Sequence, residues 1–321
     1  MKKALLPAAI AVFLPLSAMA DVTVYGKANV SLQNADEGGD SKIELVSNAS
    51  RIGIKGDEVI SDGLKVIYQF EYQTEMDDGI GGNGQTFGQR NIFIGLQGKA
   101  GTIMGGHFDT PLKAAQEKVD LFNDLEGDLA NIFNGETRAS NIVQYVTPGS
   151  FGPFTATVAY ITKENDDVDD GISASLGYNT SNVYLGVAMD QDVQAEGIDI
   201  VRAIGRVNLG PVQLGAMFES TDIDGVDDSD GFLVSALWSL SDAWALKAQY
   251  GDSDFKLAPA ALDAESASVG IDYKLSKNAV IYGYYTAIEN EGLAALDGEG
   301  NPIIANLRDD DYLGIGLDLK F

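Results

Sequence analysis

The chain has 321 residues, with 21 lysines and arginines against 48 aspartates and glutamates, so its formal net charge is −27. This acidic balance argues against nucleic acids and anionic membrane surfaces as partners, because both recruit basic side chains. The sequence contains no cysteine, which excludes a disulfide framework and a thiolate metal site. Its 37 glycines, 13 tyrosines and 13 phenylalanines indicate many strands and turns.

The first twenty residues have the three parts of a secretory signal peptide. Two lysines form a positive region, residues 4–16 are apolar, and residues 17–20 (SAMA) end in the small residues that a signal peptidase cleaves. The apolar run is short and contains two prolines, which disfavours a membrane anchor. We expect residues 1–20 to be removed on export, which leaves residues 21–321 as one domain and, without the two lysines, changes the net charge from −27 to −29.

Apolar and polar residues alternate along several segments, and a period of two is typical of β-strands. In residues 22–32 the even positions are apolar apart from one glycine, and the odd positions carry Thr23, Tyr25, Lys27 and other polar residues. Residues 64–72 and 183–190 repeat the pattern. A soluble sandwich alternates in the same way, so this pattern alone leaves both a soluble multi-sheet protein and a large barrel open.

Two further features favour a transmembrane barrel. Tight turns such as residues 179–182 and 275–278 alternate with long acidic, glycine-rich loops, as in outer-membrane barrels. The long loops span residues 164–170, 190–197, 221–231, 251–265 and 289–311. Aromatic residues lie near the ends of the apolar faces, where interfacial girdles are expected: Tyr68, Tyr72, Phe154, Tyr160, Phe218, Trp238, Trp244, Tyr250, Tyr273 and Tyr285.

The chain ends in an alternating segment, residues 312–321, whose last residue is Phe321. Such an ending resembles the assembly signal of bacterial outer-membrane barrels. An even number of strands lets an antiparallel ladder close, and sixteen leave an aqueous channel inside. We therefore predict an all-β fold, a 16-stranded antiparallel transmembrane β-barrel that forms a pore. The sixteen candidate strands lie near residues 22–32, 48–57, 63–73, 88–98, 101–107, 139–147, 153–162, 171–179, 183–190, 198–208, 212–220, 231–239, 244–251, 265–274, 279–288 and 311–321.

Several short motifs, taken in order, resemble those of Gram-negative general diffusion porins of the gammaproteobacterial type. They are DVTVYGK (residues 21–27), SRIGIKG (50–56), QRNIFIGL (89–96) and RASN (138–141), together with the closing phenylalanine. The resemblance covers the whole chain after the signal peptide. It implies passive diffusion of small hydrophilic solutes and ions across the bacterial outer membrane. It also implies a homotrimer in contact with outer-membrane lipid and lipopolysaccharide, assembled by the barrel assembly machinery, with the third loop folded into the lumen and no cofactor.

Four cations on neighbouring predicted strands match the basic wall of a porin constriction: Lys27, Arg51, Arg90 and Arg138. In the predicted strand, Ile52 and Ile54 lie on the face opposite to Arg51. If these isoleucines face lipid, Arg51 faces the lumen. Arg90 is less clear, because strict alternation turns Ile92 and Ile94 inward with it. The alternative is that each is an ordinary solvated charge.

The opposing acidic wall is expected from residues 105–141, which run without a convincing strand. Thr110 is predicted to cap a helix that starts at Pro111, with residues 112–119 forming about two turns. Beyond it, apolar residues that can anchor the loop are interleaved with carboxylates that we expect to face the channel: Asp120, Asp124, Glu126 and Asp128. The alternative is a solvated external loop whose apolar residues meet a neighbouring subunit. The acidic loops at the mouths predict a modest cation preference.

Other functions have less support. His107 is the single histidine, and the nearby Asp109 has no serine or cysteine motif beside it, so we predict no enzyme activity. Residues 222–231 lack the acidic twelfth position of an EF-hand, and we predict no metal site there, although loose Mg²⁺ or Ca²⁺ binding by the acidic loops stays open. A substrate-selective channel and an adhesin or phage receptor remain as alternatives.

Overall fold

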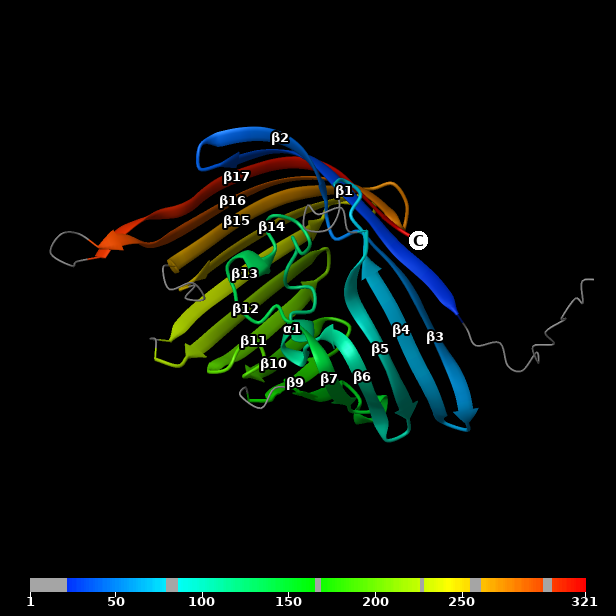
Figure 1. Cartoon of the computed structure of the whole chain (residues 1–321). Helices are drawn as coiled ribbons and strands as arrows, with labels where there is room; N and C mark the ends of the chain where they lie inside the picture. Colours follow the sequence, from blue (N-terminus) through cyan, green and yellow to red (C-terminus); the bar gives the residue numbers. More distant parts are fainter. Residues whose placement is uncertain (1–21, 79–85, 165–168, 226–227, 255–260, 297–301) are drawn as a thin grey trace, which may run out of the picture.

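The computed structural model describes residues 22–78, 86–164, 169–225, 228–254, 261–296 and 302–321. Strands make up almost all of it, and they surround a central segment that carries α1 (Figure 1). The elements are β1 (Thr23–Glu37), β2 (Asp40–Ser47), β3 (Arg51–Ser61), β4 (Leu64–Gln73), β5 (Gly88–Gly98), β6 (Gly101–Asp109), α1 (Pro111–Ala115), η1 (Leu129–Asn131), β7 (Arg138–Val146), η2 (Gly149–Phe151), β8 (Phe154–Ile161), β9 (Gly171–Asn179), β10 (Val183–Gln191), β11 (Ile198–Leu209), β12 (Val212–Ile223), β13 (Ser229–Ser239), β14 (Trp244–Ser253), β15 (Ala261–Lys274), β16 (Ala279–Leu296) and β17 (Pro302–Lys320). The predicted signal peptide lies outside the described residues.

The wall closes because β1 pairs with β17, from Lys27 opposite Lys320 to Glu37 opposite Asp310. β2 and β3 both pair with β1, β2 along its second half and β3 along its first. They are two parts of one barrel strand, interrupted at residues 48–50. Counted in this way, the described strands form the closed 16-stranded antiparallel barrel that the alternation predicted.

The two faces of the wall differ as expected. Outward-facing side chains such as Val24, Leu32 and Ile315 are exposed, whereas Asn29 and Ser31 point inward and are buried. Trp238 and Trp244 are exposed on the outer face. Among the described residues, no helix reaches the length and hydropathy needed to cross a membrane.

The prediction of a long loop at residues 289–311 is wrong in large part. β16 and β17 continue as a paired hairpin, with Glu291 opposite Asn306 and Leu296 opposite Pro302, and this hairpin extends beyond the neighbouring strands (Figure 1). The acidic composition suggested a loop, but charged residues can pair along a solvated ribbon as long as their backbone groups bond across it. β2 was not among the predicted strands.

A β-bulge explains the unclear orientation of Arg90. Phe70 lies opposite Ile92 and Tyr72 lies opposite Gln89, so Glu71 faces two residues of β5, Arg90 and Asn91. A bulge shifts the alternation by one residue. Arg90 and Asn91 therefore both point inward, and the expectation that an inward Arg90 would bring Ile92 and Ile94 with it is wrong, since Ile94 is 63% exposed on the outer face.

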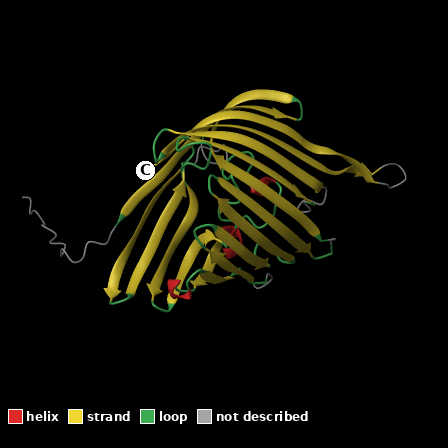
Figure 2. Ribbon diagram, turned by 180° about the vertical axis from the view of Figure 1, so that it is seen from behind, coloured by secondary structure: helices red, strands yellow, loops and turns green. Residues whose placement is uncertain are grey.

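Residues 110–137, which we call the inserted loop, lie inside the barrel. Thr110 caps α1 as predicted, its side-chain oxygen accepting from the Lys113 backbone N–H at 3.2 Å. The helix is shorter than expected and ends at Ala115, and Glu117 then takes the left-handed conformation with φ of 52°. Figure 2 shows the helical turns within a molecule that is otherwise strand and loop.

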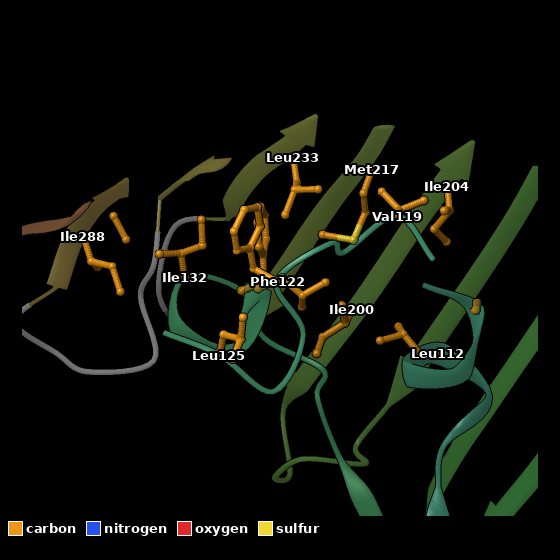
Figure 3. Close-up of a cluster of buried hydrophobic side chains, with 14 of the residues drawn as sticks. Leu112, Val119, Phe122, Leu125, Ile132, Ile200, Ile204, Met217, Leu233 and Ile288 are labelled. Carbon is orange, nitrogen blue, oxygen red and sulfur yellow. The ribbon is translucent and has the colours of Figure 1, made fainter. Parts of the chain in front are cut away.

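An apolar cluster anchors the inserted loop to the inner wall. Phe122 and Val119 are fully buried among Met217, Leu233 and other side chains of the wall (Figure 3). Leu112, Leu129 and Ile132 extend the same contact at either end of the loop. The apolar residues interleaved with the acidic ones thus face the wall, as predicted.

Phe122→Ala is expected to lower the free energy of unfolding by about 3–5 kcal/mol, because it removes a fully buried ring and leaves a cavity. The measurement is denaturation of the detergent-solubilised barrel. The control is Phe87→Ala, which truncates a ring that is 52% exposed and should change stability much less. Equal losses in the two variants would contradict the anchoring role.

Candidate functional site

The inserted loop is bonded to one side of the lumen through polar contacts as well as apolar ones. Asp120 is buried and accepts hydrogen bonds from the backbone N–H groups of Phe122 at 2.9 Å and Leu129 at 3.1 Å, and from Gln249 Nε2 at 3.0 Å. Burial and the nearby Asp128 raise the pKa of Asp120 to about 7, although these hydrogen bonds favour its ionised form. Asp120 is therefore directed at the wall.

A buried arginine holds the end of the inserted loop. Arg202 on β11 is fully buried and donates to Glu219 on β12, to Glu136 at 2.9 Å and to the backbone oxygen of Asn134 at 2.8 Å. A buried arginine needs such a full set of partners, since a missing one would leave a charge uncompensated. The network fixes residues 134–136 against the wall.

The tip of the inserted loop contacts a second part of the wall, formed by β1 and β3. Asp124 accepts from Lys27 Nζ at 2.8 Å and from Arg51 Nη2 at 3.2 Å. Burial acts to raise the pKa of Asp124, but Lys27 and Arg51 outweigh it and hold that pKa below its usual range. Glu126 accepts from Gln33 Nε2 at 2.9 Å. The tip of the loop is thus bonded to β1 and β3.

A charged cavity of about 430 Å³ lies between the inserted loop and the wall formed by β3 to β7. In the wall, Arg90 Nε donates to Glu71 at 3.1 Å, and Arg138 Nη2 donates to Asp109 at 2.8 Å. The charged side chains that line the cavity are Arg51, Arg90, Lys113 and Arg138 with Glu71, Asp109, Glu117, Asp124, Asp128 and Glu136.

Some of the predicted site residues line the charged cavity, and others are bonded elsewhere. Of the four cations, Arg51, Arg90 and Arg138 line the charged cavity, while Lys27 binds the loop tip beside it. Of the four acids, Asp124 and Asp128 line it, whereas Asp120 bonds to the wall and Glu126 bonds to Gln33. Asp128 also caps η1 by accepting from the Ala130 backbone N–H at 2.9 Å. Burial raises the pKa of both Glu126 and Asp128.

Several charged residues of the cavity were not predicted. Glu71 could have been found, because it lies on the polar face of the alternating segment at residues 64–72. Lys113 and Glu136 had no such signal, since they lie in the inserted loop, outside the alternating segments. The Lys113 ammonium is 3.5 Å from Glu136, which links the two ends of the inserted loop.

His107 and Asp109, the pair considered for catalysis, do not bond to each other. His107 Nδ1 lies 2.9 Å from Ser140 Oγ, and Asp109 bonds to Asn91 and Arg138. The pair therefore lacks the hydrogen bond through which an acid orients a catalytic histidine.

Comparison with known proteins identifies the family. A family model described as Gram-negative porin matches residues 7–293. The chain belongs to the Gram-negative porin family. Family and barrel together place this porin in the bacterial outer membrane.

Relatives of this porin include major outer membrane protein P.IB of Neisseria gonorrhoeae, 33% identical over 195 residues that cover 57% of this chain and 54% of the relative. The chain spans about half the length of that relative and of further Neisseria P.IB proteins. Outer membrane porin protein 32 of Delftia acidovorans is 26% identical over 90% of this chain and 89% of its own.

Solved porin structures share the fold. An anion-selective porin from Comamonas acidovorans has a TM-score of 0.78 at 22% identity, covering 94% of this chain and 100% of its own. OmpF of Salmonella typhi, in complex with daunomycin, has a TM-score of 0.71 at 18% identity, covering 94% and 97%. At these identities the likeness concerns the barrel alone.

Asp120→Asn is expected to reduce the pH dependence of stability. The pKa of this carboxyl group is about 7 in the folded chain, against about 4 in an unfolded one. A pKa raised by folding means that the folded state binds the proton more tightly, so this stabilisation is lost as the pH rises from about 4 to about 7. The Tm in detergent should fall over that range, and fall less in the variant.

Asp242→Asn is the matched control for this experiment, because Asp242 is exposed in the turn between β13 and β14. It should keep the wild-type slope of Tm against pH. If the curves of Tm against pH were the same for the wild type and Asp120→Asn, the raised pKa assigned to Asp120 would be wrong.

Proposed function

We propose that the protein is a passive channel through which small hydrophilic solutes and ions diffuse across the bacterial outer membrane, and that it has no enzyme activity. The observation that carries the proposal is the charged cavity of about 430 Å³ between the inserted loop and the barrel wall. A closed barrel with a polar inner face provides the aqueous path. The inserted loop would narrow that path to a constriction.

The proposed constriction acts through its charges. Asp124 and Asp128 on the loop face Arg90 and Arg138 on the wall. Opposed charges at close range create a field across the lumen, which orients dipolar solutes and disfavours apolar ones. Passage then depends on size, polarity and charge, and requires no cofactor.

We propose a modest preference for cations. The charged cavity is lined by four basic and six acidic side chains, and the chain as a whole carries a net charge of −27. An excess of negative charge raises the local concentration of cations. This differs from the solved Comamonas acidovorans porin, which is described as anion-selective.

The proposal for assembly and partners rests on membership of the porin family. We propose a homotrimer in contact with outer-membrane lipid and lipopolysaccharide, exported by a signal peptide at residues 1–20. Phe321 is 60% exposed, its ring packs against Gly26, and its backbone closes a hydrogen-bonded pair with that residue. We propose Phe321 as the signal that the barrel assembly machinery reads.

The decisive measurement is the conductance of the purified full chain in planar bilayers. Stable open channels in KCl are expected, and a protein that inserts without conducting would overturn the proposal. Saturable block by a single sugar would instead favour the substrate-selective alternative.

Arg90→Ala is expected to shift the reversal potential in a KCl gradient toward cations. The substitution removes the positive charge that is paired with Glu71 at 3.1 Å beside the path, and Glu71 keeps its hydrogen bond from the Tyr25 hydroxyl. A unit charge beside a water-filled path interacts with a passing ion by about 1 kcal/mol, so the ratio of cation to anion permeability should change by at most about fivefold. Lys99→Ala removes an 81% exposed charge from the turn between β5 and β6 and should leave the potential unchanged.

Asp124→Asn should shift the reversal potential in the opposite direction. It deprives Lys27 and Arg51 of the carboxylate that they share, which adds net positive charge to the lumen. The same KCl gradient measures it, again with an expected change of at most about fivefold. A shift toward cations would contradict the proposed role of Asp124.

A further inference from the structure

A second cavity, of about 440 Å³, adjoins the charged cavity inside the lumen. The two share Asn91, Asp109, Ala114 and Glu117 in their linings. On β9 and β10 the second cavity is lined by Asn179 and Tyr184, the residues that flank the tight turn between these strands. Tight turns lie on the periplasmic side of outer-membrane barrels. A solute entering from outside therefore meets the charged cavity first and the second cavity next.

The second cavity, which we call the aromatic cavity, has an apolar side. Phe93 and Phe108 meet edge to face with ring centroids 5.8 Å apart, and Met104 and Pro111 continue the apolar surface. The Tyr184 ring is held in place because its hydroxyl donates to the backbone oxygen of Ala115 at 2.9 Å. Simple diffusion does not need a rigid apolar surface in an aqueous lumen, and such a surface favours the burial of an apolar group.

The rest of the lining is polar and negatively charged. Glu117 contributes an exposed carboxylate, and Gln69 and Gln144 contribute amides, whereas the Asp109 carboxylate is already paired with Arg138 at 2.8 Å. Within the part of the chain that the structure describes, no basic side chain lines this cavity. The nearby Arg206 lies against the Tyr184 ring, 6.0 Å from its centroid, outside the lining. Aromatic faces and carboxylates both attract cations.

We propose that the aromatic cavity is a binding subsite for amphipathic organic cations, in which a ring or short alkyl group packs on Phe93, Phe108 and Met104 while an ammonium group lies near Glu117. A volume of about 440 Å³ is within the range of small-molecule sites. The subsite deepens the proposed channel function, on which its transport role rests. It would retain such solutes briefly after the charged cavity and thus make their flux saturable.

The probe is phenethylammonium, added to KCl-conducting channels of the full chain in planar bilayers. A saturable reduction in current is expected. Ethylammonium, which lacks the ring, and phenylacetate, which reverses the charge, should each bind at least about tenfold more weakly, because a phenyl group gains the most from burial and an anion is repelled. Equal block by either comparison compound would overturn the proposal.

Two variants test the two halves of the subsite. Glu117→Gln should weaken the apparent affinity for phenethylammonium by about two- to fivefold, the range for a partly exposed ion pair. Phe93→Ala should weaken it by about fivefold or more through the loss of aromatic contact. The control is again Asp242→Asn, which removes the same charge from a remote turn and should change nothing. Unchanged affinity in both test variants would overturn the proposal.

Calorimetric titration of phenethylammonium into the detergent-solubilised protein separates the subsite from the channel function. If the protein binds the probe with the expected variant effects but does not conduct KCl, the subsite stands and the channel proposal fails. If it conducts KCl but neither binds the probe nor is blocked by it, the channel proposal stands and the subsite fails.

Discussion

Backbone hydrogen bonding in lipid is the constraint on which this structure depends. A strand within the hydrocarbon layer has no water to bond, so each N–H and C=O needs a partner in another strand. The pairing of β1 with β17 meets this need by removing the edges that an open sheet would expose. Once the sheet is closed, alternation places one set of side chains against lipid and the other set around a lumen. The lumen is therefore a consequence of closure.

A barrel of this size has no core of its own, since its strands enclose space. The inserted loop supplies one on part of the inner wall. Phe122, Val119 and Leu112 pack there as the interior of a soluble protein would, and buried polar contacts at Asp120 and Arg202 fix the loop at two further places. The opposite part of the lumen remains open and charged. The same segment thus stabilises one half of the interior and shapes the other half.

The sequence predicted those features that depend on local period. Alternation located most strands to within a few residues, although it missed β2 and the paired extension of β16 and β17. The missing alternation at residues 105–141 located the inserted loop. The prediction of side-chain direction failed where one extra residue changes the period, as at Arg90 and Asn91. A bulge is defined by its pairing with the neighbouring strand, here with Glu71, and a single strand's sequence does not contain that pairing. Alternation also could not say which loop acids face the lumen, since Asp120 and Asp124 differ in their distant partners, Gln249 for one and Lys27 for the other. These partners are distant in sequence, and only the closed barrel brings them next to the loop.

The inserted loop is held at both of its ends and also at its tip, where Asp124 meets Lys27 and Arg51. A segment fixed at one end can swing widely, whereas a segment fixed at three points can move only by small local displacements. The free cross-section beside it should therefore vary little with time. A pore of nearly constant cross-section discriminates by size with a sharp cutoff, because fluctuations do not widen it enough to admit molecules slightly larger than its mean opening.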